Sequence, residues 1–185
     1  MKIDNVFIGL GSNLGDSARI LLRAWHLLGE DAAVTLGELS PPYISSPVDM
    51  TSNHWFTNAV GRLQTSCTPH ELLDLLMATE QELGRIREQG RIREQGRRGY
   101  QDRSIDLDLI YFGDVVMDEP RLTLPHPHRA GRLFVLAPLA AIAPDFRDPV
   151  TGVSISRLHR ELLRKITENR IEKQELSAVS WPDNP

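Results

Sequence analysis

The sequence lacks several features that would assign the protein to a specialised class. Among its 185 residues there is one cysteine, Cys67, so no disulfide can form within the chain, which is compatible with a reducing cytoplasm. No run approaches the ~20 apolar residues that cross a bilayer, and no basic segment followed by an apolar stretch opens the chain as a secretory signal would. The net charge is −4, which gives no reason to expect nucleic acid or membrane partners. We expect a cytoplasmic protein.

The remaining composition is that of a globular domain. Hydrophobic residues make up 41% and charged residues 25% of the chain, and a chain of this length buries one good core. We expect a single domain over residues 1–165, then a C-terminal tail over 166–185 that is disordered. A monomer is expected.

Hydrophobic periodicity predicts four strands and two helices before residue 113. The second helix starts at a capping box in which Thr68 and Glu71 flank Pro69. The predicted strands cover 6–10, 34–39, 56–63 and 104–112, and the predicted helices cover 16–29 and 68–84. This order is typical of a ferredoxin-like α+β sandwich, an antiparallel sheet with helices on one face. The other face is expected to hold a ligand cleft.

Two carboxylates two residues apart are the strongest functional signal. Asp106 and Asp108 begin an apolar run, and side chains alternate in a strand, so both project from one face while Leu107 and Leu109 enter the core. Two such acids repel each other unless a cation lies between them. Oxygen ligands without histidine or cysteine favour Mg²⁺ completed by substrate phosphates. The alternative is a strand edge that exposes alternating charge to solvent.

Arginines are concentrated just before these acids. The segment Gly84-Arg85-Ile86-Arg87-Glu88-Gln89 is repeated unchanged over residues 90–95. Glycine every six residues argues against a continuous helix, and the repeat is too brief for a solenoid. We expect a mobile anion-binding loop in an otherwise acidic protein.

A glycine-rich turn near the N-terminus resembles a nucleotide-binding loop only superficially. Residues 9–15 have the spacing G-x-G-x-x-x-G, which is not the dinucleotide fingerprint, and no parallel strand–helix–strand series follows. No lysine followed by serine or threonine succeeds the glycines, so the Walker A loop is excluded as well. Phosphate binding is expected elsewhere.

A second dense segment covers residues 124–136. His126 stands between Pro125 and Pro127, which predicts a rigid extended stretch. Arg132 and Phe134 alternate as in a following strand. The segment is either the wall of a phosphate site or a proline-rich loop with incidental histidines.

Four motifs in this order resemble the 6-hydroxymethyl-7,8-dihydropterin pyrophosphokinase family. They occupy residues 11–15, 56–60, 103–109 and 124–144, and the resemblance runs from about residue 5 to 160. It implies a ferredoxin-like fold and transfer of pyrophosphate from ATP to the pterin hydroxymethyl group, with release of AMP, in folate biosynthesis.

The resemblance also implies roles for individual residues. Asp106 and Asp108 would hold two Mg²⁺, and Arg85 and Arg103 would act at the transferred phosphates. ATP would be bound by Arg87, Arg121, Thr123, His126 and Arg132. The pterin would be bound by Ser45, Ser46, Val48, Phe56, Asn58 and Phe134.

Some positions depart from the family pattern. The duplication lengthens the loop and leaves open whether Arg85 and Arg87 or Arg91 and Arg93 meet the phosphates. The segment 100–103 reads Tyr-Gln-Asp-Arg where Trp-Gly-Pro-Arg is common. Two alternatives therefore stay open: a non-catalytic ferredoxin-like binding module, and a family member whose enlarged loop slows or abolishes catalysis.

Overall fold

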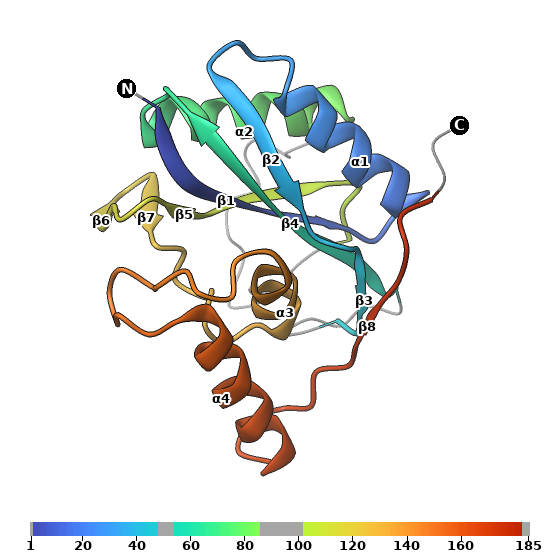
Figure 1. The fold of residues 1–185 in the computed structure, drawn as a ribbon. Helices are drawn as coiled ribbons and strands as arrows, with labels where there is room; N and C mark the ends of the chain where they lie inside the picture. Colours follow the sequence, from blue (N-terminus) through green and yellow to red (C-terminus); the bar gives the residue numbers. More distant parts are fainter. Residues whose placement is uncertain (1, 48–53, 86–101, 183–185) are drawn as a thin grey trace.

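The fold is an antiparallel sheet with helices on both faces (Figure 1). A computed structural model describes residues 2–47, 54–85 and 102–182. Strand order in the main sheet is β5–β1–β4–β3–β8, with β2 also paired to β4, and β6 and β7 form a separate ribbon. The strands are β1 Ile3–Ser12, β2 Val34–Leu39, β3 Tyr43–Ser45, β4 Phe56–Thr65, β5 Asp106–Phe112, β6 Met117–Glu119, β7 Leu122–Leu124 and β8 Leu176–Ala178. The helices are α1 Ser17–Leu28, α2 Pro69–Glu82, α3 Leu133–Ile142 and α4 Ile155–Thr167.

The ferredoxin-like prediction is confirmed, but helices were expected on one face only, whereas α3 and α4 also cover part of the second face. Elements β1, α1, β2, β4, α2 and β5 follow each other along the chain, and β5 and β4 flank β1 in the sheet. The strands of the two units β1–α1–β2 and β4–α2–β5 therefore alternate in the sheet, as expected of this topology. The capping box of Thr68 and Glu71 forms at the start of α2, and Asp16 caps α1.

Helices α1 and α2 cover the first face of the sheet, above it in Figure 1. Leu10, Leu107 and Leu109 point into this core, as strand alternation predicted. Trp25 of α1 packs so closely on β4 that a Cβ placed on Gly61 would lie 2.3 Å from its ring. Glycine at this position is what lets the helix approach the sheet.

Helices α3 and α4 lie on the second face and cover part of it. The strand predicted around Arg132 and Phe134 is wrong, because α3 begins at Leu133. This helix is apolar on nearly all sides since it is buried between the sheet and α4. It therefore lacks the one-sided stripe of a surface helix, and a short apolar run does not distinguish helix from strand.

A register shift between β1 and β5 changes which face β5 presents. Phe7 pairs with Tyr111 and Ile8 with Leu109, so Ile110 is an extra residue on β5. Before this bulge the second face receives Asp106 and Asp108, and after it Tyr111 takes the same face. The carboxylates and the aromatic core under α3 thus share one surface.

The chain after residue 165 makes specific contacts with the sheet. The boundary expected at residue 165 falls inside α4, and β8 pairs antiparallel with β3. The indole nitrogen of Trp181 donates to the Ser40 carbonyl at 3.0 Å. A three-residue strand carries no readable periodicity, so the sequence predicted no strand here. Among the helices in the described ranges, none is both long and apolar enough to cross a membrane.

Candidate functional site

The site is centred on the two carboxylates of β5. Asp106 and Asp108 project from the second face and line the same cavities, while Leu107 between them is buried on the first face. The predicted convergence of the two acids is confirmed. β5 is the edge strand of the main sheet, as the sequence alternative supposed, but both acids are half-buried and line cavities on the second face.

Asp106 is held by two arginines. Its Oδ1 accepts from Arg85 Nη1 at 2.6 Å, and its Oδ2 accepts from Arg103. Arg85 belongs to the first copy of the repeated segment, so this copy supplies an arginine to the carboxylates. Arg87 and the arginines of the second copy lie outside the described residues.

Glu80 on α2 completes this cluster, and sequence reasoning missed it. Its side chain is 1% exposed, pairs with Arg85, and accepts the Leu107 backbone N–H at 2.8 Å. A buried acid that satisfies both groups locks the helix end to the head of β5. The only sequence signal was an acid at an apolar position of the predicted helix.

Asp108 has a different electrostatic environment from Asp106. Burial, followed by the negative charge of Asp106, raises the pKa of Asp108 to about 7. The positive charges of Arg132 and Arg103 act in the opposite direction and only partly offset this. The positive charges of the arginines therefore do not fully balance the negative charges of the two acids, and an additional cation would stabilise the ionised form of Asp108.

This donor set fits Mg²⁺. Among the described residues there is no cluster of three or more histidine, cysteine, aspartate or glutamate side chains that would hold a metal ion alone. Mg²⁺ is typically bound by one or two carboxylates and completed by water and phosphate oxygens. Two carboxylates, one with a raised pKa, agree with that requirement.

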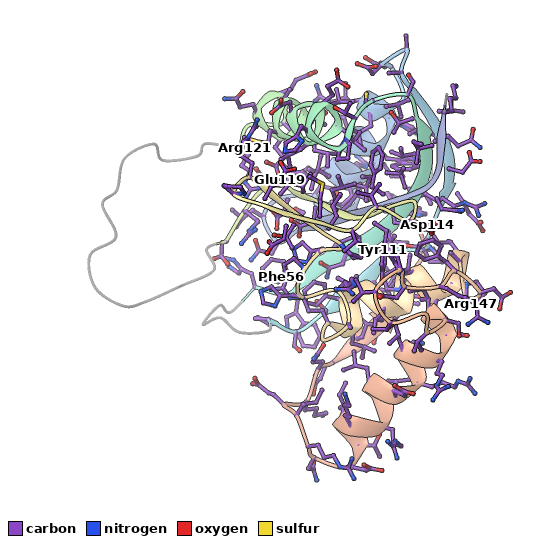
Figure 2. The ribbon with its side chains drawn as sticks, turned by 90° about the vertical axis from the view of Figure 1, so that its left-hand side faces the viewer. Phe56, Tyr111, Asp114, Glu119, Arg121 and Arg147 are labelled. Atoms are coloured by element: carbon purple, nitrogen blue, oxygen red, sulfur yellow. The ribbon has the colours of Figure 1, made fainter. Side chains whose placement is uncertain are left out.

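Two cavities meet at the carboxylates. Arg103, Asp106, Asp108 and Arg132 line both of them. The first, the sheet pocket, is further lined by Ser45, Ser46, Phe56, Asn58, Phe134 and Val135. The second, the arginine pocket, is further lined by Leu73, Met77, Arg85, Arg121 and His126. Phe56 and Arg121, one from each, lie on the same side of the molecule (Figure 2).

Glycines of β1 form the floor of the sheet pocket. Gly11 pairs with Asn58 on one side and Asp106 on the other, and Gly9 pairs with Val60 and Asp108. A Cβ on Gly11 would lie 3.2 Å from Asn58 Oδ1. The absence of side chains here keeps the cavity open between two strands of polar groups. Sequence reasoning placed Gly9 in the first strand and Gly11 in the turn after it, and did not identify either as part of a ligand cavity.

Asn58 presents an oriented amide to the sheet pocket. It is 6% exposed, and its Nδ2 donates to Ser45 Oγ at 2.9 Å. This bond fixes the direction of the amide, so its oxygen faces the β1 side. Phe56 and Phe134 line the same cavity, with the Arg132 guanidinium 5.5 Å from the centre of the Phe134 ring. A flat ring with hydrogen-bonding edges fits between such groups. Val48 lies outside the described residues.

His126 faces the arginine pocket as a neutral donor. Burial, then the nearby charge of Arg132, lowers the pKa of His126 to about 4. Its Nδ1 accepts the His128 backbone N–H at 3.2 Å, so the ring proton of the neutral form is on Nε2. The backbone N–H of His126 donates to the Ile110 carbonyl at 2.9 Å. This bond anchors the stretch around His126 to β5.

The two remaining predicted nucleotide residues lie on the β6–β7 ribbon. Arg121 lines the arginine pocket and pairs with Asp74 at 2.6 Å. The Thr123 hydroxyl donates to Asp118 at 2.9 Å, and Thr123 is not among the described residues that line either cavity. The structure therefore brings Arg121 to the site but not Thr123.

Comparisons with known proteins agree with this geometry. A family model described as 7,8-dihydro-6-hydroxymethylpterin-pyrophosphokinase matches residues 7–144. A protein of Pseudomonas aeruginosa named 2-amino-4-hydroxy-6-hydroxymethyldihydropteridine pyrophosphokinase is 39% identical over 80% of this chain and 85% of its own length. One of the same name from Methylorubrum extorquens is 36% identical over 91% of this chain and 98% of its own length.

A solved structure supports the fold. The Plasmodium falciparum wild-type HPPK-DHPS crystal structure with SDX-DHP superposes with a TM-score of 0.71 at 13% identity, over 91% of this chain. This chain spans 46% of that longer protein. At such low identity the likeness concerns the fold alone.

Proposed function

The chain belongs to the 7,8-dihydro-6-hydroxymethylpterin-pyrophosphokinase family, and on that premise we propose which of its residues carry the reaction. It transfers pyrophosphate from ATP to the hydroxymethyl group of 6-hydroxymethyl-7,8-dihydropterin in folate biosynthesis. The hydroxymethyl oxygen forms a bond to the β-phosphorus as the bond from that phosphorus to the α,β-bridging oxygen breaks. AMP is the leaving group and the hydroxyl proton is released.

The observation that carries the assignment of roles is that the two cavities share the carboxylates. A pterin in the sheet pocket and a triphosphate in the arginine pocket would meet beside Asp106 and Asp108. Holding two reactants in line is a large part of catalysis in phosphoryl transfer, which needs little covalent help from protein. The reacting atoms would therefore lie beside the two acids.

Asp106 and Asp108 would hold two Mg²⁺ ions. Bound Mg²⁺ supplies charge neutralisation at the phosphate oxygens. The raised pKa of Asp108 supports this role, since a neighbouring cation favours its charged form. Asp106 also accepts bonds from Arg85 and Arg103, and these two arginines would supply positive charge next to the bound phosphates.

The arginine pocket supplies the remaining positive charge and donors for ATP. Arg103 and Arg132 stand between the cavities, and Arg85, Arg121 and His126 extend from them towards α2 and the β6–β7 ribbon. Fixed donors of this kind stabilise charge that spreads over phosphate oxygens in the transition state. Arg87 and Thr123 stay predictions for the nucleotide.

The sheet pocket would bind the pterin. The Asn58 amide, oriented by Ser45, would read its hydrogen-bonding edge, and Phe56 and Phe134 would contact its faces. Ser46 lines the same wall, and Val48, two residues later in the sequence, stays a prediction for the pterin. We further propose that the protein is a monomer and acts in the cytoplasm. Sedimentation of the purified chain tests its oligomeric state.

AMP release from ATP and Mg²⁺, with and without 6-hydroxymethyl-7,8-dihydropterin, tests the assignment. We expect pterin-dependent AMP that a chelator abolishes. Asp106→Ala and Asp108→Ala should each lower kcat by about 10³-fold or more, the range reached when a group that stabilises transition-state charge is removed. Asp114→Ala, at an exposed aspartate on the turn after β5, is the matched control. Unimpaired turnover in both site variants would refute the metal-binding role.

A further inference from the structure

A glutamine outside the family match contacts the backbone on both sides of Arg132. Gln174 Oε1 accepts the Leu133 N–H at 2.7 Å, and Gln174 Nε2 donates to the Gly131 carbonyl at 3.0 Å. The family model matches residues 7–144, so this glutamine lies in the C-terminal segment beyond it. Its amide therefore brackets Arg132, which is one of the residues that line both cavities.

The bond to Leu133 satisfies a helix terminus that has no cap of its own. Leu133 is the first residue of α3, and the residue before it, Arg132, provides no side-chain cap. The first N–H groups of a helix lack partners within the helix. Gln174 supplies one from 41 residues away in sequence, so the start of α3 is defined by the C-terminal segment.

The next residue holds the opposite wall of the sheet pocket. The Glu175 N–H donates to Ser46 Oγ at 3.1 Å, and the Ser46 N–H donates to the Glu175 carbonyl at 3.0 Å. Leu176 then starts β8 beside Ser45. Two consecutive residues, Gln174 and Glu175, therefore connect the Ser45–Ser46 wall to the Arg132–Phe134 wall.

We propose that Gln174 is a positioning residue of the pyrophosphokinase site, acting through Arg132 and Phe134, and that the segment 174–176 is part of that site. The proposal rests on the substrate-binding roles proposed above for Arg132 and Phe134. The bracketing bonds hold the backbone of residue 132 in place, which directs its guanidinium over the Phe134 ring and towards Asp108. Small displacements of such groups are enough to lower turnover substantially.

Gln174→Ala and Gln174→Glu separate positioning from folding. The alanine variant loses both bonds, and the glutamate variant keeps an acceptor for Leu133 but loses the donor to Gly131. We expect KM for the pterin to rise about tenfold in Gln174→Ala, because Arg132 and Phe134 are no longer held in the position that fits the pterin. Glu172→Ala, at an exposed position of the same segment, should leave both constants unchanged. A role only in folding would instead lower kcat in proportion to the active fraction with KM unchanged, and would refute the proposal.

A double-mutant cycle with Arg132→Ala identifies the residue through which Gln174 acts. If Gln174 works through Arg132, its substitution should have little further effect on kcat/KM in the Arg132→Ala background. Because the proposal also names Phe134, the same cycle is run with Phe134→Ala, and full additivity in both backgrounds would overturn the proposal even if KM rises. If Arg132→Ala itself leaves kcat/KM unchanged, the proposed substrate role of Arg132 fails first. If Gln174→Ala does not fold, the same cycle with Gln174→Glu decides.

Discussion

At the scale of single residues, the sheet pocket depends on what β1 omits as much as on what β4 and β5 supply. Gly9 and Gly11 occupy the strand between Asn58 and the two aspartates. Any side chain on the second face of β1 at these positions would project into the space between them. The cavity therefore occupies the space that side chains at Gly9 and Gly11 would fill. It is bordered by the Asn58 amide on β4 and by the carboxylates of Asp106 and Asp108 on β5.

Gly11→Val should block the pterin without unfolding the protein. Gly11 lies in regular strand, a backbone conformation that valine favours, but its Cβ would lie 3.2 Å from Asn58 Oδ1. We expect the Kd for the pterin to rise at least tenfold, about 1.4 kcal/mol, with the Kd for Mg²⁺ and ATP nearly unchanged. Equilibrium titration of each ligand measures both. Equal weakening of the two ligands would show that valine disturbs the sheet rather than the pocket.

Strand parity made some of these residues predictable and left others unrecognised. Alternation within a strand placed Asp106 with Asp108 on one face of β5, and Asn58 with Phe56 on one face of β4. Gly9 and Gly11 follow the same alternation along β1. Because a glycine has no side chain, the sequence pattern does not show that it leaves space for a ligand on one face. Glu80 was missed because its partners, Arg85 and the Leu107 N–H, come from separate parts of the chain.

At the scale of elements, one buried ionic cluster joins three segments beneath the site. Asp148, in the connection from α3 to α4, is 1% exposed. It accepts from the Tyr111 hydroxyl at 2.9 Å and from Arg129 Nε at 2.5 Å. Arg129 N–H in turn donates to the His126 carbonyl at 3.1 Å. The cluster thereby ties β5 and the α3–α4 connection to the turn that carries His126.

This cluster predicts a defined acid dependence of stability. Burial opposes ionisation of Asp148, but the bonds from Arg129, Thr151 and Tyr111 prevail and lower its pKa to about 2. The unfolded value is about 3.9. Because the folded pKa is the lower one, the contribution to stability is complete above pH 4 and is lost as the pH falls towards 2.

Asp148→Asn should expose this contribution. Its free energy of unfolding should be lower than that of the wild type by about 2 to 3 kcal/mol at pH 7, and the gap should narrow between pH 4 and pH 2. Urea unfolding at a series of pH values measures the gap. Asp145→Asn, at an exposed aspartate three residues earlier, should show no such gap. A gap of constant size across this range would mean that Asp148 does not titrate as described.

Elements were predictable where their residues repeat and not where tertiary contacts define them. The strands β1, β4 and β5 and helices α1 and α2 follow clear periodicities and caps, whereas the segment of β2 has a weak pattern although its strand was predicted. The strands β3 and β8 have three residues each. They form because β3 pairs with β4 and β8 pairs with β3. Helix α3 is defined by burial on all sides and by Gln174 at its start.

At the scale of the whole molecule, the site is assembled from segments distributed over most of the fold. The cavities draw on β1, β3, β4, β5, the β6–β7 ribbon, α2 and the start of α3, and β8 supports the wall at β3. These segments come together only in the folded chain. A ligand that contacts several of them binds the native state and not the unfolded one, so its binding must raise global stability.

ATP with Mg²⁺ should therefore raise the unfolding temperature, and removal of the metal should largely abolish the rise. At about one hundred times its Kd, a ligand contributes about 2.7 kcal/mol, which corresponds to roughly 5–10 °C for a chain of this size. With ATP and EDTA we expect less than half of this shift, because Asp106 and Asp108 repel phosphates unless a cation lies between them. AMP with Mg²⁺ should also give a small shift, since AMP lacks the phosphates that reach the carboxylates. Differential scanning fluorimetry of the wild type and of Asp108→Ala tests both expectations, and an undiminished shift in EDTA would show that the arginines alone bind ATP.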